Sequence, residues 1–220
     1  MPPTFFVIPV AGCIIYLNYS KRCHVVCSDF NMTQIFGEFT DDFSDRSEFL
    51  VLGFSPSTLS IQQRWKTNGL SADFLGDYVK NFLPGDTTAA LSKQTEIRFA
   101  VSFVANELLE NAMKYSDLNA DQPINLEVHL FRDRLIFLSK NSLPQASIAD
   151  FQSFLQELMI GDVGEMYFNQ VEKSAENDDS GSSGLGYFTM IMDYEAVLGW
   201  KFEQVENDVT VVSTMVKLPL

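Results

Sequence analysis

The residue types best suited to chemistry lie close together between Asn106 and Tyr115, where the chain reads NELLENAMKY. Glu107 and Asn111 are four residues apart and Lys114 is three further on, so a helix would project all three side chains from one face. A carboxylate can orient or deprotonate a nucleophile, an amide oxygen can ligate Mg²⁺, and an ammonium group can contact phosphate. Asparagine is a poor helix former, so its presence in a helical pattern needs a reason. The same spacing is also typical of an ordinary solvated helix face.

A second candidate is the glycine- and serine-rich stretch 180–188, which reads SGSSGLGYF. Its glycines are Gly181, Gly184 and Gly186. Glycines let a backbone approach a ligand closely, and the helix that we expect from Leu185 onward offers free N–H groups and a positive dipole end to a phosphate. The stretch is not a Walker A loop, because Tyr187 stands where that motif has lysine, and no predicted strand leads into it as in a dinucleotide-binding loop. On its own, it also fits a flexible loop that caps a helix.

Together, the two stretches resemble motifs of the GHKL ATPase superfamily, which includes gyrase, the heat-shock chaperone, histidine kinases and the mismatch-repair protein MutL. Residues 107–115 resemble the N box, and residues 183–187 resemble the second glycine box. The order of the motifs, the predicted hairpin between them and a lid-like loop before the glycines are also similar, and the resemblance spans roughly residues 92–218. Glu107 favours the bacterial anti-sigma-factor serine kinases, because histidine kinases generally have asparagine there.

The resemblance implies ATP and Mg²⁺ as ligands and a role for each motif residue. Asn111 would hold Mg²⁺, Glu107 would act as the general base, and Lys114 would contact phosphate oxygens. The residues expected to surround the triphosphate are Gly181, Gly184, Leu185 and Gly186. The loop 176–183 would form a lid over the phosphates.

One motif of the superfamily is missing. The first glycine box, Asp-x-Gly-x-Gly, supplies the aspartate that recognises the amino group of adenine, and it should follow the predicted strand 134–138. The sequence there reads SKNSLP (139–144), so Asn141 is the best substitute, since its side-chain oxygen can accept a hydrogen bond from an amino group. Asp162 begins a less complete match, Asp-Val-Gly, between two helical patterns.

The periodicity of the apolar residues predicts a single α+β domain over residues 32–220. The expected strands are 48–54, 124–129, 134–138, 201–205 and 209–218, and the expected helices are 72–82, 88–115, 148–159, 165–175 and 185–196. Residues 68–71 should form a turn and N-cap before the first helix, and residues 207–208 the last turn. The resemblance implies a two-layer α/β sandwich of the GHKL (Bergerat) type, with a mixed sheet, helices on one face and the nucleotide between the helix 88–115 and the lid.

Residues 1–31 differ from the rest of the chain. Residues 5–17 form an almost unbroken apolar run that is too short to span a bilayer, which needs about 20 apolar residues. Lys21 and Arg22 against Asp29 give the segment a net charge of +1, which leaves −15 on the remainder. Three interpretations stay open: a start-site extension before Met32, a buried or partner-binding arm, and a targeting segment.

The composition argues against several classes of function. The chain of 220 residues has 46% hydrophobic residues and a formal net charge of −14, which is typical of a folded protein that does not bind nucleic acid unaided. Its only histidines, His24 and His129, argue against a multi-histidine metal site. The cysteines at 13, 23 and 27 form no disulfide framework, which is consistent with a reducing cytoplasm. We expect no membrane span.

We therefore expect a bacterial, cytoplasmic regulator that resembles the anti-sigma and partner-switching serine kinases and transfers the γ-phosphoryl group of ATP to Ser or Thr of a small partner protein. That partner would be similar to an anti-sigma-factor antagonist, and the protein itself could form a homodimer. The alternative is a non-catalytic GHKL-like interaction module with a degenerate nucleotide site. A histidine-kinase catalytic domain is a third interpretation, disfavoured because no histidine lies between His24 and His129.

Overall fold

The computed structural model describes residues 6–10, 13–17, 23–26, 33–55, 61–176, 184–205 and 209–220. The chain divides into two compact units, Met1–Met32 and Thr33–Leu220. The first unit contains a three-stranded antiparallel sheet of β1 (Phe6–Val10), β2 (Cys13–Leu17) and β3 (Cys23–Val26). The apolar run near the start of the chain therefore supplies the first two strands of a sheet.

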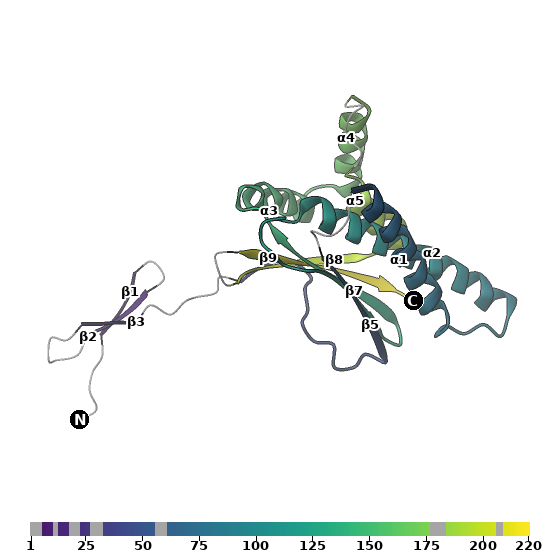
Figure 1. The fold of residues 1–220 in the computed structure, drawn as a ribbon, viewed down its shortest axis with the longest axis horizontal. Coiled ribbons are helices and arrows are strands. Elements are labelled where there is room, and N and C mark those ends of the chain that lie inside the picture. Colours follow the sequence, from purple (N-terminus) through teal and green to yellow (C-terminus); the bar gives the residue numbers. More distant parts are fainter. Residues whose placement is uncertain are drawn as a thin grey trace. The chain divides into compact units, whose positions relative to one another are not determined.

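The second unit has a six-stranded sheet in the order β4-β8-β9-β7-β6-β5 (Figure 1). Its strands are β4 (Gln34–Gly37), β5 (Glu48–Phe54), β6 (Ile124–Leu130), β7 (Arg134–Leu143), β8 (Val197–Gln204) and β9 (Thr210–Pro219). The α+β class and the two-layer arrangement are confirmed. The sheet is not mixed as expected, because every neighbouring pair is antiparallel. Short connections join β6 to β7 and β8 to β9, and parallel pairing would need a longer crossover.

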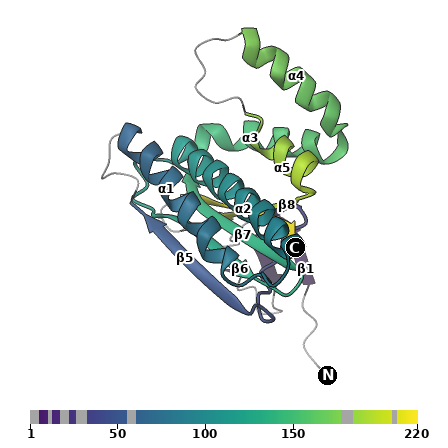
Figure 2. The same cartoon turned by 90° about the vertical axis from the view of Figure 1, so that its right-hand side faces the viewer.

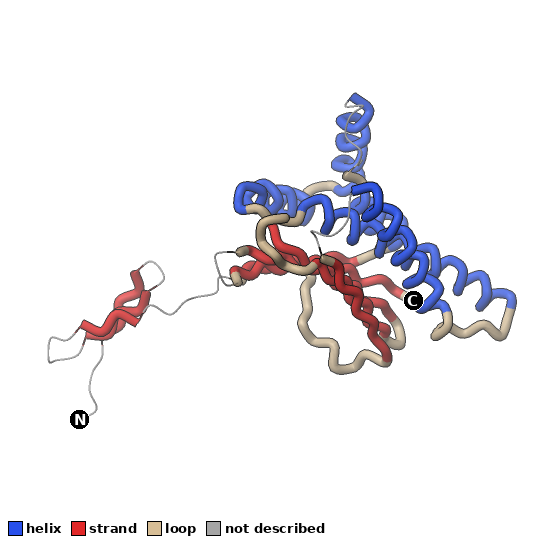
Figure 3. Tube along the Cα trace, viewed as in Figure 1, coloured by secondary structure: helices blue, strands red, loops and turns tan. Residues whose placement is uncertain are grey.

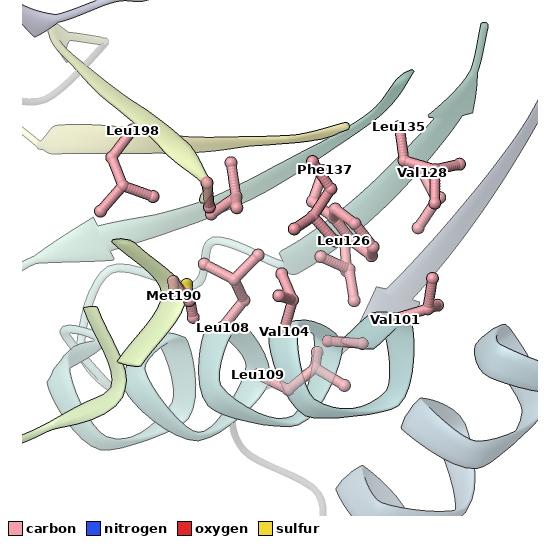
Figure 4. Close-up of a cluster of buried hydrophobic side chains, with 14 of the residues drawn as sticks. Val101, Val104, Leu108, Leu109, Leu126, Val128, Leu135, Phe137, Met190 and Leu198 are labelled. Carbon is pink, nitrogen blue, oxygen red and sulfur yellow. The ribbon is translucent and has the colours of Figure 1, made fainter. Parts of the chain in front are cut away.

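The helices of this unit gather on one side of the sheet (Figure 3). They are α1 (Ile61–Lys80), α2 (Thr88–Tyr115), α3 (Gln145–Ile160), α4 (Val163–Glu176) and α5 (Gly186–Tyr194). The core lies between α2 and the sheet, where Val101, Val104 and Leu108 pack with Leu126 and Phe137 (Figure 4). Among the described residues, no helix combines the length and the apolar character that crossing a membrane requires.

Helix α2 has the limits that the sequence predicts. Thr87 is its N-cap residue, and its Oγ1 accepts a hydrogen bond from the N–H of Ala90 at 3.1 Å. At the other end, Ser116 has an extended conformation and donates a hydrogen bond to the carbonyl of Ala112. Both ends therefore have local causes, which explains why sequence alone could locate them.

Helix α1 is longer than expected, because it begins at Ile61 and runs through Gly69, where a turn was predicted. Asn68 and Ala72, on either side of that position, are both buried, and Leu75 continues the buried side. Packing of this side against α2 outweighs the local turn signal, so the predicted turn and N-cap are wrong.

The remaining differences concern strands. β4 was not predicted, since it has only four residues and pairs with β8 from the far end of the chain. β7 and β8 are both longer than expected because their pairing with β9 continues over their whole length. Of the predicted lid over 176–183, Glu176 is the last residue of α4 and residues 177–183 lie outside the described residues, as does the predicted turn at 207–208.

The face of the sheet opposite the helices carries a smaller apolar cluster. Its buried members are Phe131, Ile136, Leu138 and Met215, and Phe39 and Phe43 of the β4–β5 connection pack against them. Two ion pairs also join this connection to the sheet. Lys201 Nζ of β8 lies 3.0 Å from Asp41 Oδ2, and Lys217 Nζ of β9 lies 3.1 Å from Glu38 Oε2. This connection therefore covers part of the second face.

We predict that a chain starting at Met32 folds as stably as the full chain, because the core of the second unit is built from that unit's own residues. Thermal unfolding followed by circular dichroism should give melting temperatures within about 4 °C, the shift that about 1 kcal/mol produces in a domain of this size. A larger drop for the shorter chain would show that the first unit stabilises the second.

Candidate functional site

Helix α2 presents the predicted site residues beside its buried stripe. Glu107 and Asn111 are each half-buried, next to the fully buried Leu108 and Ala112, whereas Lys114 is exposed. Glu107 and Asn111 therefore do not belong to an ordinary solvated helix face.

Helix α5 brings Gly186 onto the carboxylate of Glu107. A Cβ atom at residue 186 would overlap Glu107 Oε2 and would lie 3.0 Å from its Cδ and 3.3 Å from its Cγ. Any side chain at position 186 would therefore require the Glu107 side chain to shift. The N-box-like and glycine-box-like motifs, which are far apart along the chain, meet at this contact.

The glycine-rich motif also contacts α4. Gly184 has a φ of +64°, in the left-handed region, and a Cβ atom there would lie 2.9 Å from Gln170 Nε2. Leu185 is the N-cap residue of α5 and is half-buried. Gly181 lies outside the described residues. The described part of the motif is thus held between α2 and α4.

The environment of Glu107 changes its acidity. Burial raises the pKa of the Glu107 carboxyl above its usual value, and the nearby charge of Glu110 adds to the rise. Glu110 itself accepts a hydrogen bond from Asn106 Nδ2 at 2.8 Å. A buried carboxylate with a raised pKa is a better proton acceptor near neutral pH than a solvated one.

Tyr187 places its hydroxyl group among polar side chains of α2 and the sheet. Burial raises the pKa of Tyr187, and nearby polar groups oppose that rise. These groups belong to Trp200, Thr214 and Asn111. The Tyr187 and Trp200 rings meet edge to face, with centroids 5.5 Å apart and planes at 90°. The Asn111 amide therefore lies near the Tyr187 hydroxyl, and this proximity is a second link between the two motifs.

A row of polar positions crosses the sheet on the side of this hydroxyl group. Ser139 of β7 lies opposite Thr214 of β9, which lies opposite Trp200 of β8. Because side chains alternate along a strand, Ser139 shares the helix-facing side with Phe137 of the core. Two polar atoms of this row are buried without hydrogen-bond partners. Ser139 is 2% exposed and Trp200 is 1% exposed.

Ser139 Oγ has no hydrogen-bond partner, and Trp200 Nε1 lies near Tyr187 without hydrogen-bond geometry. Buried polar atoms without partners are rare, and these two could bind a polar ligand.

Asn141 lies within a strand and not after one. β7 continues to Leu143, so Asn141 is buried and lies opposite Val212 of β9. Its Nδ2 donates a hydrogen bond to the carbonyl oxygen of Ser142 at 3.0 Å. Two residues from Ser139 on the same strand, Asn141 is on the helix-facing side and borders the polar row.

Asp162, the less complete match to the missing glycine box, has a structural role. Its Oδ1 accepts a hydrogen bond from the N–H of Glu165 at 2.9 Å, at the start of α4. Nothing in this arrangement brings Asp162 to Glu107 or Asn111.

The sequence analysis did not identify Ser139, Thr214 or Tyr187 as residues of the site. Thr214 lies between the apolar residues Val212 and Val216 on one side of β9, and this interruption of an apolar alternation was the available signal. Ser139 gave a weaker signal, because Phe137 and Asn141 flank it on the same side of β7. Tyr187 lies within the glycine-box-like stretch 183–187, but no site role was predicted for it, because a tyrosine in an apolar helical pattern is typical of a core residue. In the part of the chain that the structure describes, no group of three or more His, Cys, Asp or Glu residues could hold a metal ion. Asn111 is the residue whose amide oxygen could contribute to such a site.

Replacing Gly186 by alanine should destabilise the domain, because the new methyl group would overlap the Glu107 carboxylate. Overpacking of this kind costs about 1–3 kcal/mol, which urea unfolding will measure. The double variant Gly186→Ala/Glu107→Ala should lose less than the sum of the single variants, since removal of the carboxylate makes room. Strictly additive losses would contradict the contact.

A matched control is Gly69→Ala, because a Cβ atom at this helical position of α1 has no neighbour within 4 Å. We expect this substitution to stabilise the domain by about 0.5–1 kcal/mol, since alanine loses less backbone entropy in a helix.

Glu107→Gln should change how stability depends on pH. Because the folded pKa is raised, the folded state binds more protons than the unfolded state at pH values just above 4.5, and the contribution of Glu107 to stability falls as pH rises through that window. The glutamine variant should therefore be more stable than the wild type at neutral pH and nearly equal to it at about pH 4. Denaturant unfolding across this range will measure the difference. Glu96→Gln removes the same charge from an exposed position of α2 and serves as the control; equal pH profiles for the two variants would contradict the prediction.

No protein-family model matches this sequence, and the curated proteins include no significant match to it. What the protein does therefore has to be inferred from the residues that α2, α5 and the sheet bring together.

Proposed function

We propose that this protein is a bacterial, cytoplasmic regulatory kinase of the GHKL type, which binds ATP with Mg²⁺ between α2 and α5 and transfers the γ-phosphoryl group to Ser or Thr of a small partner protein. The observation that carries the proposal is the position of Gly186 against the Glu107 carboxylate. Gly186 leaves the backbone at the start of α5 accessible, and the N–H groups of a helix start can bind a phosphate group. The Glu107 carboxylate beside it could accept the proton of the hydroxyl group that attacks that phosphate.

The residues present fit both ligands. The amide oxygen of Asn111 is a suitable ligand for Mg²⁺, which when bound would neutralise part of the triphosphate charge. The N-terminal end of α5, with Gly184 and Gly186, offers backbone N–H groups to phosphate oxygens. Ser139 Oγ, buried without a partner, is available to a polar group of the base. Asn141 borders it on the same strand.

In the transfer step, Glu107 would accept the proton of the partner's hydroxyl group. The hydroxyl oxygen then bonds to the γ-phosphorus as the bond from that phosphorus to the ADP oxygen breaks. The raised pKa of Glu107 favours proton transfer near neutral pH, and its partial burial limits competition from water.

Nucleotide entry requires α5 to move relative to α2. Gly186 lies against Glu107, and Tyr187 lies near Asn111, so the two side chains proposed to act on the nucleotide are covered by the start of α5. Movement of a short helix at the end of a glycine-rich stretch is a common way for an enzyme to admit and enclose its substrate.

A second candidate function is a non-catalytic interaction module with the same fold. The observation that favours it is the position of Asn141, the substitute for the missing aspartate, which is buried within β7 and does not follow a strand. In an interaction module, α5 does not move away from α2, and the contacts of Gly186 and Tyr187 with α2 only stabilise the fold. The two functions differ in whether ATP binds.

Two substitutions in α2 separate binding from chemistry. Asn111→Ala should weaken binding of Mg²⁺ and ATP by about tenfold or more, because the metal loses a ligand. Glu107→Gln should leave the affinity nearly unchanged and reduce phosphoryl transfer or ATP hydrolysis by about 10²-fold or more. Isothermal titration calorimetry and release of labelled phosphate measure the two effects.

Glu96→Gln and Asn119→Ala are the matched controls, since both residues are exposed. Neither should change affinity or turnover. If the wild-type protein binds no ATP at about millimolar concentration, an affinity worth only about 4 kcal/mol, the kinase proposal fails and the interaction module remains.

A further inference from the structure

A groove of about 400 Å³ is lined by residues of α1 and α2 and by Tyr194, the last residue of α5. Helices α1 and α2 run side by side (Figure 2). Gly69 of α1 is one of the lining residues, and a Cβ atom there would meet nothing within 4 Å. The groove therefore reaches the backbone of α1 at this glycine. Concave sites lined by aromatic side chains and a few polar groups are typical binding sites.

Aromatic rings form much of the groove. Phe103 of α2 and Tyr194 line it together, with ring centroids 5.3 Å apart and planes at 38°. Phe99, one turn before Phe103, is 59% exposed and also lines the groove. The guanidinium carbon of Arg98 lies 5.5 Å from the centroid of the Phe99 ring. One guanidinium group is thus already held over an aromatic face here, and the Phe103 and Tyr194 rings offer further surface that attracts a cation.

Two polar residues of the groove offer hydrogen-bond acceptors. Asp73 has a side chain that is 65% exposed, and its Oδ1 lies 4.0 Å from Arg98 Nη2. Arg98 is bound more closely by Asp77, whose Oδ1 accepts a hydrogen bond from Arg98 Nε at 2.5 Å. Asn106 Nδ2 donates to Glu110 Oε1 at 2.8 Å, so the Asn106 amide offers its oxygen to a ligand. The groove is therefore suited to a ligand that carries N–H donors.

The charge around the groove is negative. Asp73 and Asp77 face the single positive charge of Arg98, which leaves an excess of one negative charge on this side. On the other side, burial raises the pKa of Tyr194, and the charge of Asp193 adds to the rise. The whole chain has a formal net charge of −14, so it attracts basic proteins and repels acidic ones.

We propose that this groove binds an arginine side chain that a basic partner protein presents. A guanidinium group is planar and always charged, stacks on aromatic rings and donates several hydrogen bonds to carboxylate and amide oxygens. It would bind between the Asp73 carboxylate and the Phe103 and Tyr194 rings, with the Asn106 oxygen as a further acceptor.

Exposure at the groove favours a partner protein over a free small molecule. Sites for small molecules enclose most of the ligand's surface, whereas Asp73 and Phe99 remain more than half exposed. A partner protein would cover what the groove leaves open. A second copy of this chain is disfavoured, because two chains of charge −14 repel each other.

The proposal does not rest on the kinase function, because a non-catalytic interaction module could use the same groove. Its test contains no nucleotide, so its failure would leave the proposal of ATP binding unaffected.

The test is a titration of the full ¹⁵N-labelled chain, followed by nuclear magnetic resonance, with the blocked peptide acetyl-Ala-Arg-Ala-amide. We expect saturable shifts of the Gly69 and Asn106 amide signals. The peptide with citrulline in place of arginine has the same shape without the charge, and should bind about tenfold more weakly or worse. The free cation n-butylguanidinium should bind no more tightly than the arginine peptide.

Substitutions in the groove locate the binding. Gly69→Trp should abolish it, because the indole ring occupies the hollow, whereas Gly69→Ala should retain it; circular dichroism verifies that both variants fold. Asp73→Asn should weaken binding by about tenfold, because the carboxylate charge is lost. Asp150→Asn, at an exposed position of α3 that does not line the groove, should have no effect.

Four results would each overturn the proposal. They are no saturable shift at about 10 mM peptide, an affinity worth less than about 3 kcal/mol; equal binding of the arginine and citrulline peptides; tighter binding of n-butylguanidinium than of the arginine peptide; and unchanged binding by a folded Gly69→Trp variant.

Discussion

Helix α2 has to pack against the sheet and two other helices at once, and the arrangement of the domain depends on this packing. Its buried stripe, which includes Val101, Val104 and Leu108, lies on the centre of the sheet (Figure 4). On one side, α1 approaches so closely that a Cβ atom at Gly76 would overlap Ser102 Oγ. On the other side, α5 approaches equally closely at Gly186. A Cβ atom at Gly76 would also lie 2.8 Å from the backbone oxygen of Arg98, whereas one at Gly186 would displace the Glu107 side chain. Helix α2 is thus packed between two helices that could not be separated from it without losing buried contact.

The same position of α2 gives the candidate site its electrostatic character. Glu107 and Asn111 lie where α2, α5 and the sheet come together, and burial there raises the pKa of the Glu107 carboxyl. Ser139 Oγ is buried nearby without a partner, which costs about 1–3 kcal/mol in a folded protein. An apolar residue at position 139 would avoid that cost. A buried polar atom without a hydrogen-bond partner between helices and sheet is expected where a ligand supplies that partner.

Much of the fold could be predicted from the sequence, and the errors have a common cause. The limits of α2 and β5 follow from local signals: an apolar stripe with a threonine N-cap in one case, and an apolar run bounded by polar residues in the other. The prediction failed at Gly69, where contact with α2 keeps α1 helical, and at Leu138, beyond which β9 continues to pair with β7. In both cases the deciding partner is distant in the sequence, so no local pattern contains the information.

Some features of the candidate site could likewise be predicted from the sequence, and others depend on the tertiary structure. Residue type and helical spacing were enough to identify Glu107 and Asn111, because the face of a helix is a local property, and the glycine at 186 could be recognised within its motif. Only the tertiary structure seats Gly186 on Glu107 and aligns Ser139 and Thr214 across neighbouring strands. The physical reason is that acidity, close approach and satisfaction of hydrogen bonds depend on what surrounds a side chain, and packing between distant segments determines those surroundings.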